Sequence, residues 1–254
     1  MHEDISALKK YTTTKDYLVS GEVFSLYLDA HKEMLITHPQ PNELEKYYNS
    51  DAYISHKDSS HNLIDKIYHY VKNYTLYKKE KLIRDHAPYG KTLLDIGVGT
   101  GDFMQTTTNR DWETTGVEPN AAARGKAQKK GMHVVPDLNS VPVKHYDVIT
   151  LWHVLEHVPD LKQSISKIDT LLSPEGTLII AVPNYKSYDA QLYKSHWAAF
   201  DTPRHLWHFS QKSISLLFEQ HNLSVVETVP MYFDAFYVSL LSEKNKTGKN
   251  NYIK

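Results

Sequence analysis

Residues 93–101 read LLDIGVGTG, and this stretch decides the fold of the chain. It joins a short apolar strand to three glycines at alternate positions, Gly97, Gly99 and Gly101, and a helical pattern begins at Asp102. Glycine is favoured where the backbone turns sharply or where a ligand lies directly against the main chain. A strand, a glycine-rich loop and a helix in this order are typical of a ligand-binding α/β sheet.

Short strands and helices alternate along the chain on both sides of this loop. Short apolar runs predict buried parallel strands, and the amphipathic segments between them predict helices. The expected strands are residues 92–96, 114–118, 133–135, 146–152 and 177–182, with helices from 102 onward, at 120–130 and at 161–172. This alternation predicts an α/β fold: a Rossmann-like, doubly wound, mostly parallel sheet with helices on both faces.

The N-terminal part of the chain shows weaker patterns. Residues 1–58 are polar with a short helical signal at 42–48, and apolar residues recur at helical spacing from 59 to 86. We interpret residues 1–86 as a small helical and irregular lid, and residues 87–254 as the α/β domain. The lysines on the second half of the long helix are interpreted as an ordinary solvated face.

The C-terminal part is also less regular. A helical pattern covers residues 211–221, and the β-branched run at 224–229 predicts a sixth strand. The apolar segment 232–241 is the candidate for a last strand of the sheet.

One acidic residue, Glu118, ends the strand that follows the glycine loop. An acid about twenty residues after such a loop accepts hydrogen bonds from ribose hydroxyls. A nicotinamide or flavin dinucleotide needs a third glycine where this chain has Asp102, whose carboxylate would face a pyrophosphate. S-adenosylmethionine carries no phosphate, and its sulfonium and amino group are cations, so acids such as Asp95 and Asp102 are favourable near it. The residues favour S-adenosylmethionine, and a loop that binds nothing is the remaining alternative.

Several blocks between residues 92 and 184 resemble the signature segments of class I S-adenosylmethionine-dependent methyltransferases. Residues 93–101 resemble the first block, 116–120 (GVEPN) the second, and 171–178 (LLSPEGTL) the turn into the fifth strand. The chain resembles bacterial small-molecule and ubiquinone-biosynthesis-type O-methyltransferases. The resemblance implies an enzyme that transfers a methyl group to a small molecule, at oxygen in our interpretation, and leaves S-adenosylhomocysteine as product.

The same resemblance implies the residues that bind the cofactor. Asp95 and the glycine loop would hold the methionine portion, Glu118 and Pro119 the ribose side, and Asp137 with Leu138 the adenine ring. Trp152 and His153 would form the floor of the site. The full expected set is Asp95, Gly97, Gly99, Gly101, Glu118, Pro119, Asp137, Leu138, Trp152 and His153.

A histidine segment at residues 153–157 (HVLEH) matches the H-x-x-E-H pattern of some zinc proteases. We expect His153 on a strand-to-helix turn instead of inside a helix, which argues against two histidines on one helix face. The ubiquinone-type relatives have Glu-x-x-Glu-His here and bind a divalent metal. In this chain Glu156 and His157 match this pattern, but His153 replaces the first glutamate, and imidazole is a poorer magnesium ligand than carboxylate. We therefore expect no metal and interpret Glu156 and His157 as hydrogen-bonding residues at a helix start; a metal at these two residues is the alternative.

The connection at residues 183–210 is rich in aromatic residues and histidines. A loop of this length inside a compact domain is uncommon unless it is functional. Residues 201–210 (DTPRHLWHFS) resemble a segment of many bacterial small-molecule methyltransferases. His205 is the candidate catalytic base, and Arg204 and Trp197 are candidate substrate-binding residues. Tyr53 and His56 are candidates for a lid over the cofactor.

Composition excludes several classes of protein. The chain has no cysteine, which excludes disulfides, cysteine-ligated zinc and a thiol nucleophile. Its net charge of −1 gives no global electrostatic case for nucleic acid. No apolar run approaches the ~20 residues that cross a bilayer. We expect a cytoplasmic protein that acts on a small-molecule acceptor and has neither nucleic acid nor membrane as a partner. The alternative functions are a non-catalytic S-adenosylmethionine-binding module and an RNA methyltransferase.

Overall fold

The computed structural model describes residues 5, 7–48 and 63–248. The chain divides into two compact units, one formed by Met1–Ser59 together with Pro183–Lys254 and the other by Ser60–Val182. The domain boundary expected after residue 86 stays a prediction. Residue 86 lies inside the second unit, at the end of a helix. Among the described residues, no helix combines the length and the apolar composition that a membrane span requires.

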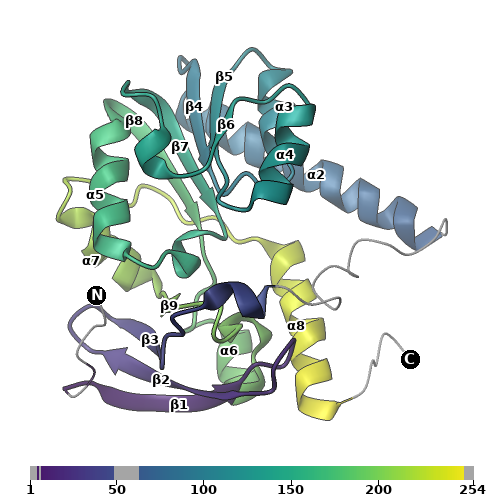
Figure 1. The fold of residues 1–254 in the computed structure, drawn as a ribbon, viewed down its shortest axis with the longest axis vertical. Helices are drawn as coiled ribbons and strands as arrows, with labels where there is room; N and C mark the ends of the chain where they lie inside the picture. Colours follow the sequence, from purple (N-terminus) through teal and green to yellow (C-terminus); the bar gives the residue numbers. More distant parts are fainter. Residues whose placement is uncertain (1–4, 6, 49–62, 249–254) are drawn as a thin grey trace. The chain divides into compact units, whose positions relative to one another are not determined.

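The second unit contains the predicted parallel sheet. Its five strands lie in the order β6-β5-β4-β7-β8, and every neighbouring pair is parallel. Strand order reverses beside β4, so the glycine loop lies at the carboxyl edge where ligands bind in such sheets. Figure 1 shows α5 on one side of the sheet and α2, α3 and α4 on the other. The strands are β4 (Thr92–Ile96), β5 (Glu113–Val117), β6 (Val134–Val135), β7 (Tyr146–Trp152) and β8 (Leu172–Ala181).

The helices of this unit begin and end where the sequence places capping residues. The side chain of Asn120 accepts a hydrogen bond from the Ala123 amide, and Asp160 does the same for Gln163. Buried leucines and isoleucines form one stripe along α5, as the periodicity predicts. The helices are α2 (Leu63–His86), α3 (Asp102–Thr108), α4 (Ala121–Lys129) and α5 (Leu161–Leu171). Among the described residues, short 3-10 turns are η1 (Leu44–Tyr47) in the first unit, and η3 (Leu138–Ser140) and η4 (Leu155–His157) in the second.

The first unit differs from the lid that the sequence predicts. Its described N-terminal part is a sheet in the order β1-β2-β3-β9, with each strand antiparallel to its neighbour. Local patterning missed it because β9, which pairs with β3, lies far along the chain from it, and no short-range pattern reports such a pairing. The expected helical signal at 42–48 corresponds to η1. The strands are β1 (Lys9–Lys15), β2 (Val23–Asp29), β3 (Met34–His38) and β9 (Trp207–His208).

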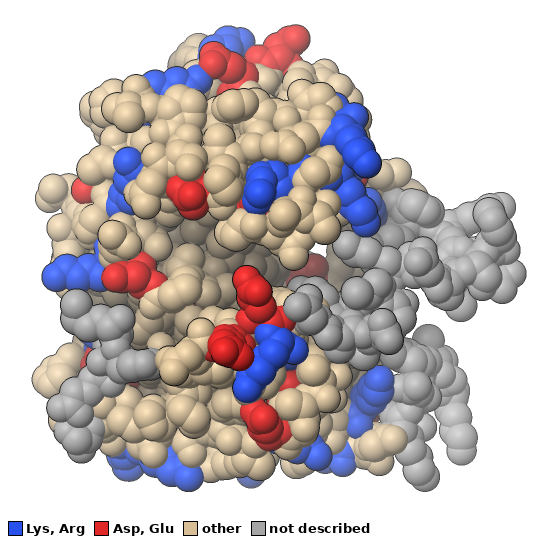
Figure 2. Space-filling model, in the orientation of Figure 1, with Lys and Arg blue, Asp and Glu red and all other residues tan. Residues whose placement is uncertain are grey.

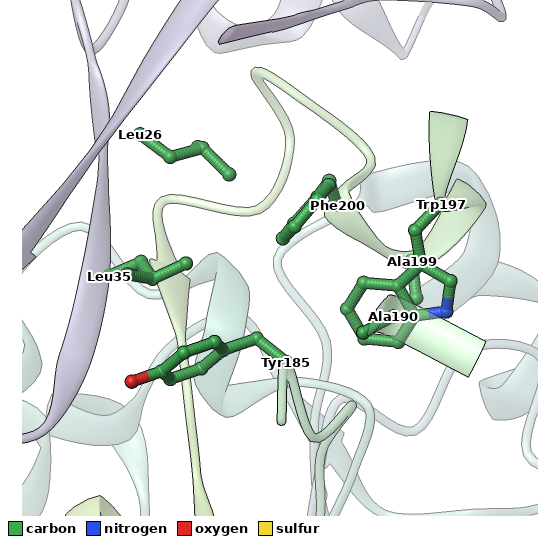
Figure 3. Packing of buried hydrophobic residues seen from close by; sticks show 7 residues of the cluster. All are labelled: Leu26, Leu35, Tyr185, Ala190, Trp197, Ala199 and Phe200. Atoms are coloured by element: carbon green, nitrogen blue, oxygen red, sulfur yellow. The ribbon is translucent and has the colours of Figure 1, made fainter. Parts of the chain in front are cut away.

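The residues after Val182 complete this unit. The long connection contains short helices, and its aromatic residues pack against β2 and β3 around Tyr185, Trp197 and Phe200 (Figure 3). The expected strand at 224–229 is wrong, since these residues are exposed, form no regular secondary structure and pair with no described strand. The segment at 232–241 is not a strand either, but the start of helix α8, which has Asp234 in its first turn and Gly248 after its end. The helices are α6 (Tyr188–Tyr193), η5 (Lys194–His196), η6 (Ala198–Phe200), α7 (Gln211–Glu219) and α8 (Tyr232–Thr247).

Candidate active site

The glycine loop after β4 has the left-handed backbone that only glycine adopts without strain. Gly97, Gly99 and Gly101 have φ angles of 79°, 58° and 84°. A methyl group added at Gly97 would overlap Val154, and one added at Gly101 would crowd Ala127 on α4, so both glycines permit close packing. A methyl group at Gly99 would meet no described atom within 4 Å. Gly99 therefore presents bare backbone to open space, as the cradle of a ligand requires.

Glu118 follows β5 and turns its carboxylate back to the glycine loop. Its Oε2 accepts a hydrogen bond of 2.7 Å from the Gly99 amide, and its Oε1 accepts one of 2.9 Å from the Asn120 amide. The next residue, Pro119, is exposed, and its carbonyl oxygen accepts a hydrogen bond from Arg124. The expected acid and the expected loop are thus adjacent, with the acid oriented by two backbone donors.

Asp95 is the last acid of β4 before the loop and is buried, with 2% of its surface exposed. Its Oδ1 accepts a 2.6 Å hydrogen bond from the Thr150 hydroxyl on β7. Burial raises the pKa of Asp95 to about 7; the Thr150 hydrogen bond and the charge of Lys79 oppose this shift, and Glu118 adds to it.

Asp102, the second acid expected near the cofactor, is held by two lysines. Lys72 on α2 and Lys130 after α4 each place Nζ 2.7 Å from a carboxylate oxygen of Asp102. Burial alone would raise the pKa of Asp102, but the hydrogen bonds and charges of Lys130 and Lys72 lower it to about 2. The charge of Asp102 is therefore largely balanced within the protein.

Lys79 is a site residue that the sequence did not single out. Its ammonium lies 4.4 Å from the centre of the Trp152 ring, at the carboxyl end of β7, and its charge acts on Asp95. Trp152 itself packs edge-on against Phe103 at 5.4 Å. Lys72 and Lys79 belong to the face of α2 that we interpreted as ordinary solvated surface, and these two side chains turn to the glycine-loop side instead. Their spacing of seven residues, two helical turns, was the available signal.

The expected adenine-binding pair lies at the turn after β6. Asp137 is exposed and caps η3, accepting hydrogen bonds from the Asn139 and Ser140 amides and from the Ser140 hydroxyl. These donors lower the pKa of Asp137, so its carboxylate is ionised at neutral pH. Leu138, the first residue of η3, is partly buried.

His153 follows β7 directly and has a left-handed backbone, with φ at 58°. A non-glycine residue in this conformation is strained, and such residues gather at functional sites. Its Nδ1 lies 3.6 Å from Oε1 of the buried Glu156. The predicted turn is confirmed: His153 precedes the short η4 and does not share a helix face with His157.

Arg204 lies in the first unit as part of a buried charge network. Its guanidinium donates to the carboxylates of Asp16 at 2.9 Å and Asp201 at 2.5 Å, and to the carbonyl oxygen of Tyr47. The side chain is 1% exposed. Burial works against ionisation of Asp16, yet hydrogen bonds from Arg204 and from Ser20 hold the pKa of Asp16 below its usual range.

His205, the candidate base, is buried beside this network. Its Nδ1 lies 2.9 Å from the carbonyl oxygen of Ala199, and its Nε2 lies 3.9 Å from a carboxylate oxygen of Asp201. The neighbouring His208 bonds to the Thr37 hydroxyl, and burial holds the pKa of His208 well below its usual value. Trp197 packs within the core cluster, edge-on to Phe200 at 5.1 Å.

The family model described as a methyltransferase domain matches residues 53–228 of the 254. This chain belongs to that methyltransferase family. The matched region contains both the glycine loop and His205, but not the strands β1 to β3. The class I assignment and the Rossmann-like fold that the sequence predicts are therefore confirmed.

Individual members of the family match over shorter stretches. A ubiquinone biosynthesis O-methyltransferase of Aeromonas salmonicida is 33% identical over 106 residues, which cover 38% of this chain and 44% of that protein. A C-methyltransferase of Streptomyces niveus is 26% identical over 148 residues, covering 54% of this chain and 34% of that protein. These matches span about half or less of the curated relatives' own length.

Solved structures of methyltransferases share the fold. Magnesium protoporphyrin IX methyltransferase from Synechocystis PCC 6803, solved with SAH bound, superposes with a TM-score of 0.56 at 19% identity. The superposition covers 73% of this chain and 90% of that one. At 19% identity, this similarity shows that the two proteins share a fold and no more.

Proposed function

We propose that this methyltransferase binds S-adenosylmethionine at the glycine loop and transfers its methyl group to a hydroxyl of a small molecule. One observation carries the cofactor assignment: Glu118 extends its carboxylate over the open backbone of Gly99. A ribose placed against Gly99 would have both hydroxyls within reach of that carboxylate. The SAH-bound structural relative supports the same cofactor here.

The remaining residues of the site suit the other parts of this cofactor. Lys79 supplies a cation beside Trp152, which fits the carboxylate of the methionine portion. Asp95 supplies an acid for its amino group, and Asp137 with Leu138 lies at the turn after β6 for the adenine. When bound, S-adenosylmethionine supplies a methyl carbon that the sulfonium already activates.

His205 is our candidate for the base that acts on the acceptor. A carbonyl oxygen only accepts hydrogen bonds, so the contact with Ala199 places the imidazole hydrogen on Nδ1 and leaves Nε2 as the basic nitrogen. As the base, Nε2 would take the proton of the acceptor hydroxyl and so make its oxygen nucleophilic toward the methyl group. The carboxylate of Asp201 then stabilises the imidazolium.

Arg204 fits a structural role better than the substrate-binding role expected from the sequence. Its charge is matched by the carboxylates of Asp16 and Asp201, and its side chain is buried. A substrate acid would have to displace one of these carboxylates. We therefore assign Arg204 to the support of the loop that carries His205.

A small-molecule acceptor agrees with the charge of the surface. Figure 2 shows Lys and Arg side chains over α4, whereas basic and acidic residues are mixed on the rest of that face. The basic residues near α4 are largely engaged: Lys72 and Lys130 pair with Asp102, and Arg124 bonds to the Glu118 and Pro119 carbonyl oxygens. An RNA methyltransferase would need a continuous basic surface. The relatives named for ubiquinone biosynthesis favour a small hydroxylated acceptor.

The test is methyl transfer from labelled S-adenosylmethionine to a panel of phenols, catechols, sugars and amines. We expect turnover with a hydroxylated acceptor, and a loss of about 100-fold or more in kcat for His205→Asn with unchanged cofactor affinity. The variant His133→Asn, at an exposed position before β6, serves as the matched control. Cofactor binding without turnover on any acceptor would favour the non-catalytic binding module, and turnover on amines alone would refute O-methylation.

A further inference from the structure

The two acids beside the glycine loop are in opposite electrostatic states. Asp102 is one-third exposed and bonded to two lysines, so it remains ionised. Asp95 is 2% exposed, and its Oδ1 accepts a hydrogen bond from the neutral Thr150 hydroxyl. A buried carboxylate without a bonded cation is costly, and such a group takes up a proton instead.

Three charged or polar side chains from three neighbouring elements act on Asp95. Thr150 on β7 donates its hydroxyl, Lys79 on α2 contributes a positive charge, and Glu118 after β5 contributes a negative one. Burial outweighs the first two and raises the pKa of Asp95 to about 7. At neutral pH the ligand-free protein is thus a mixture of molecules with Asp95 protonated and ionised.

A cation placed beside this carboxyl would change the balance. A unit charge within ~4–6 Å favours the ionised form of an acid, and the effect is larger where water is excluded. S-adenosylmethionine carries an ammonium on the methionine portion, which the loop directly after Asp95 would hold. Asp102 offers no comparable response, because its lysines already keep it ionised.

We propose that, in mildly acidic solution, Asp95 holds a proton in the ligand-free protein and releases it to solvent when the ammonium of S-adenosylmethionine docks beside it. The O–H bond of the carboxyl breaks, the proton goes to water or buffer, and the carboxylate pairs with the ammonium. This inference rests on the proposed cofactor site and adds a proton balance to it. Cofactor affinity then depends on pH in a definite direction.

The direction follows from the number of protons bound in each state. Below pH 7 the free protein binds more protons at Asp95 than the complex does, so raising the pH favours the complex. Affinity should increase by up to about tenfold per pH unit between pH 5.5 and 7, and then level off. The plateau begins where Asp95 is already ionised in the free protein.

The test is titration calorimetry at pH 6.0 in two buffers of different ionisation enthalpy, which gives the protons released per cofactor bound. We expect release of close to one proton with S-adenosylmethionine, and about half of that near pH 7. Asp95→Asn should abolish the release, and 5′-methylthioadenosine, which lacks the amino acid, should release none with the unaltered protein. The variant Asp102→Asn should leave the release intact.

A second measurement uses the unaltered protein, so it does not require the Asp95→Asn variant to fold. The carboxyl carbon of Asp95 in the unaltered protein, labelled with ¹³C, should titrate near pH 7 without cofactor and stay ionised at pH 6 with it. Binding without proton release, or release that survives Asp95→Asn, would refute this inference and leave the cofactor site standing. Absence of any binding would instead refute the cofactor assignment itself.

Discussion

The Oε2 atom of Glu118 lies 2.7 Å from the backbone nitrogen of Gly99. The two residues follow the neighbouring parallel strands β5 and β4, so the sheet itself brings them together. The left-handed conformation of Gly99 directs its amide toward the carboxylate and leaves the position of a Cβ open. This relationship joins the acid that we assign to the nucleoside sugar to a bare-backbone cradle.

Gly99→Ala should weaken cofactor binding and cause only a small loss of stability. The left-handed backbone costs an alanine about 1 kcal/mol, and the added methyl group would occupy the open space that the ligand needs. Gly131→Ala is the matched control, because Gly131 also has a positive φ and open space around it but lies after α4. Both variants should unfold at similarly lowered urea concentrations, while only Gly99→Ala loses affinity, by at least about tenfold.

Lys79→Met should weaken binding of S-adenosylmethionine but not of its decarboxylated analogue. The ammonium of Lys79 beside Trp152 is assigned to the methionine carboxylate, and a charge-assisted hydrogen bond is worth about 1.5–3 kcal/mol. Lys78→Met, one position earlier on the exposed side of α2, is the control. Equal losses for both ligands would show that Lys79 acts on the fold of the site and not on the carboxylate.

Asp95→Asn should stabilise the ligand-free protein more at pH 8 than at pH 5. Because its pKa is raised, Asp95 does not lower the free energy of unfolding below about pH 4, where it is protonated in both the folded and the unfolded chain. The cost grows as the pH rises and reaches at most about 4 kcal/mol above pH 7. Thermal unfolding at the two pH values measures the effect. A Tm difference between variant and parent that is the same at both would contradict a protonated Asp95.

Arg204→Met should destabilise the protein by about 3–5 kcal/mol, because it leaves the buried Asp16 carboxylate without its cation. Lys186→Met removes the cation of an exposed ion pair with Glu33 and should cost less than about 1 kcal/mol. Urea unfolding of both variants gives the comparison. A cost for Arg204→Met as small as that for Lys186→Met would return Arg204 to the substrate-binding role expected from the sequence.

Local patterns in the sequence were sufficient for the parallel sheet. The strands β4 and β7 match their expected bounds, because each is a buried apolar run with a clear turn on both sides. Gly97, Gly99 and Glu118 were predictable for a similar reason: the chemistry of a ligand cradle dictates residue types at short, fixed spacings. The fold of the second unit followed, and so did the proximity of Glu118 to the glycine loop.

The first unit could not be predicted in this way. The strand β3 is buried through its pairing with β9, whose residues lie far along the chain, and no local pattern reports such a pairing. The run at 224–229 has strong strand propensity, yet without a described partner strand its backbone makes no ladder. Lys79 and Arg204 carry no pattern that distinguishes them from surface cations; only their packing against Trp152 and Asp16 does.

Calorimetry with S-adenosylmethionine and with NAD tests the cofactor site most directly. The unaltered protein should bind S-adenosylmethionine and not NAD, and Glu118→Ala should weaken that binding by at least about tenfold through loss of the ribose hydrogen bonds. Glu113→Ala alters the exposed first residue of β5, the strand that Glu118 follows, and should bind S-adenosylmethionine as the parent does. Binding of NAD in preference, or affinity for S-adenosylmethionine that is equal in Glu118→Ala and the parent, would contradict the assignment.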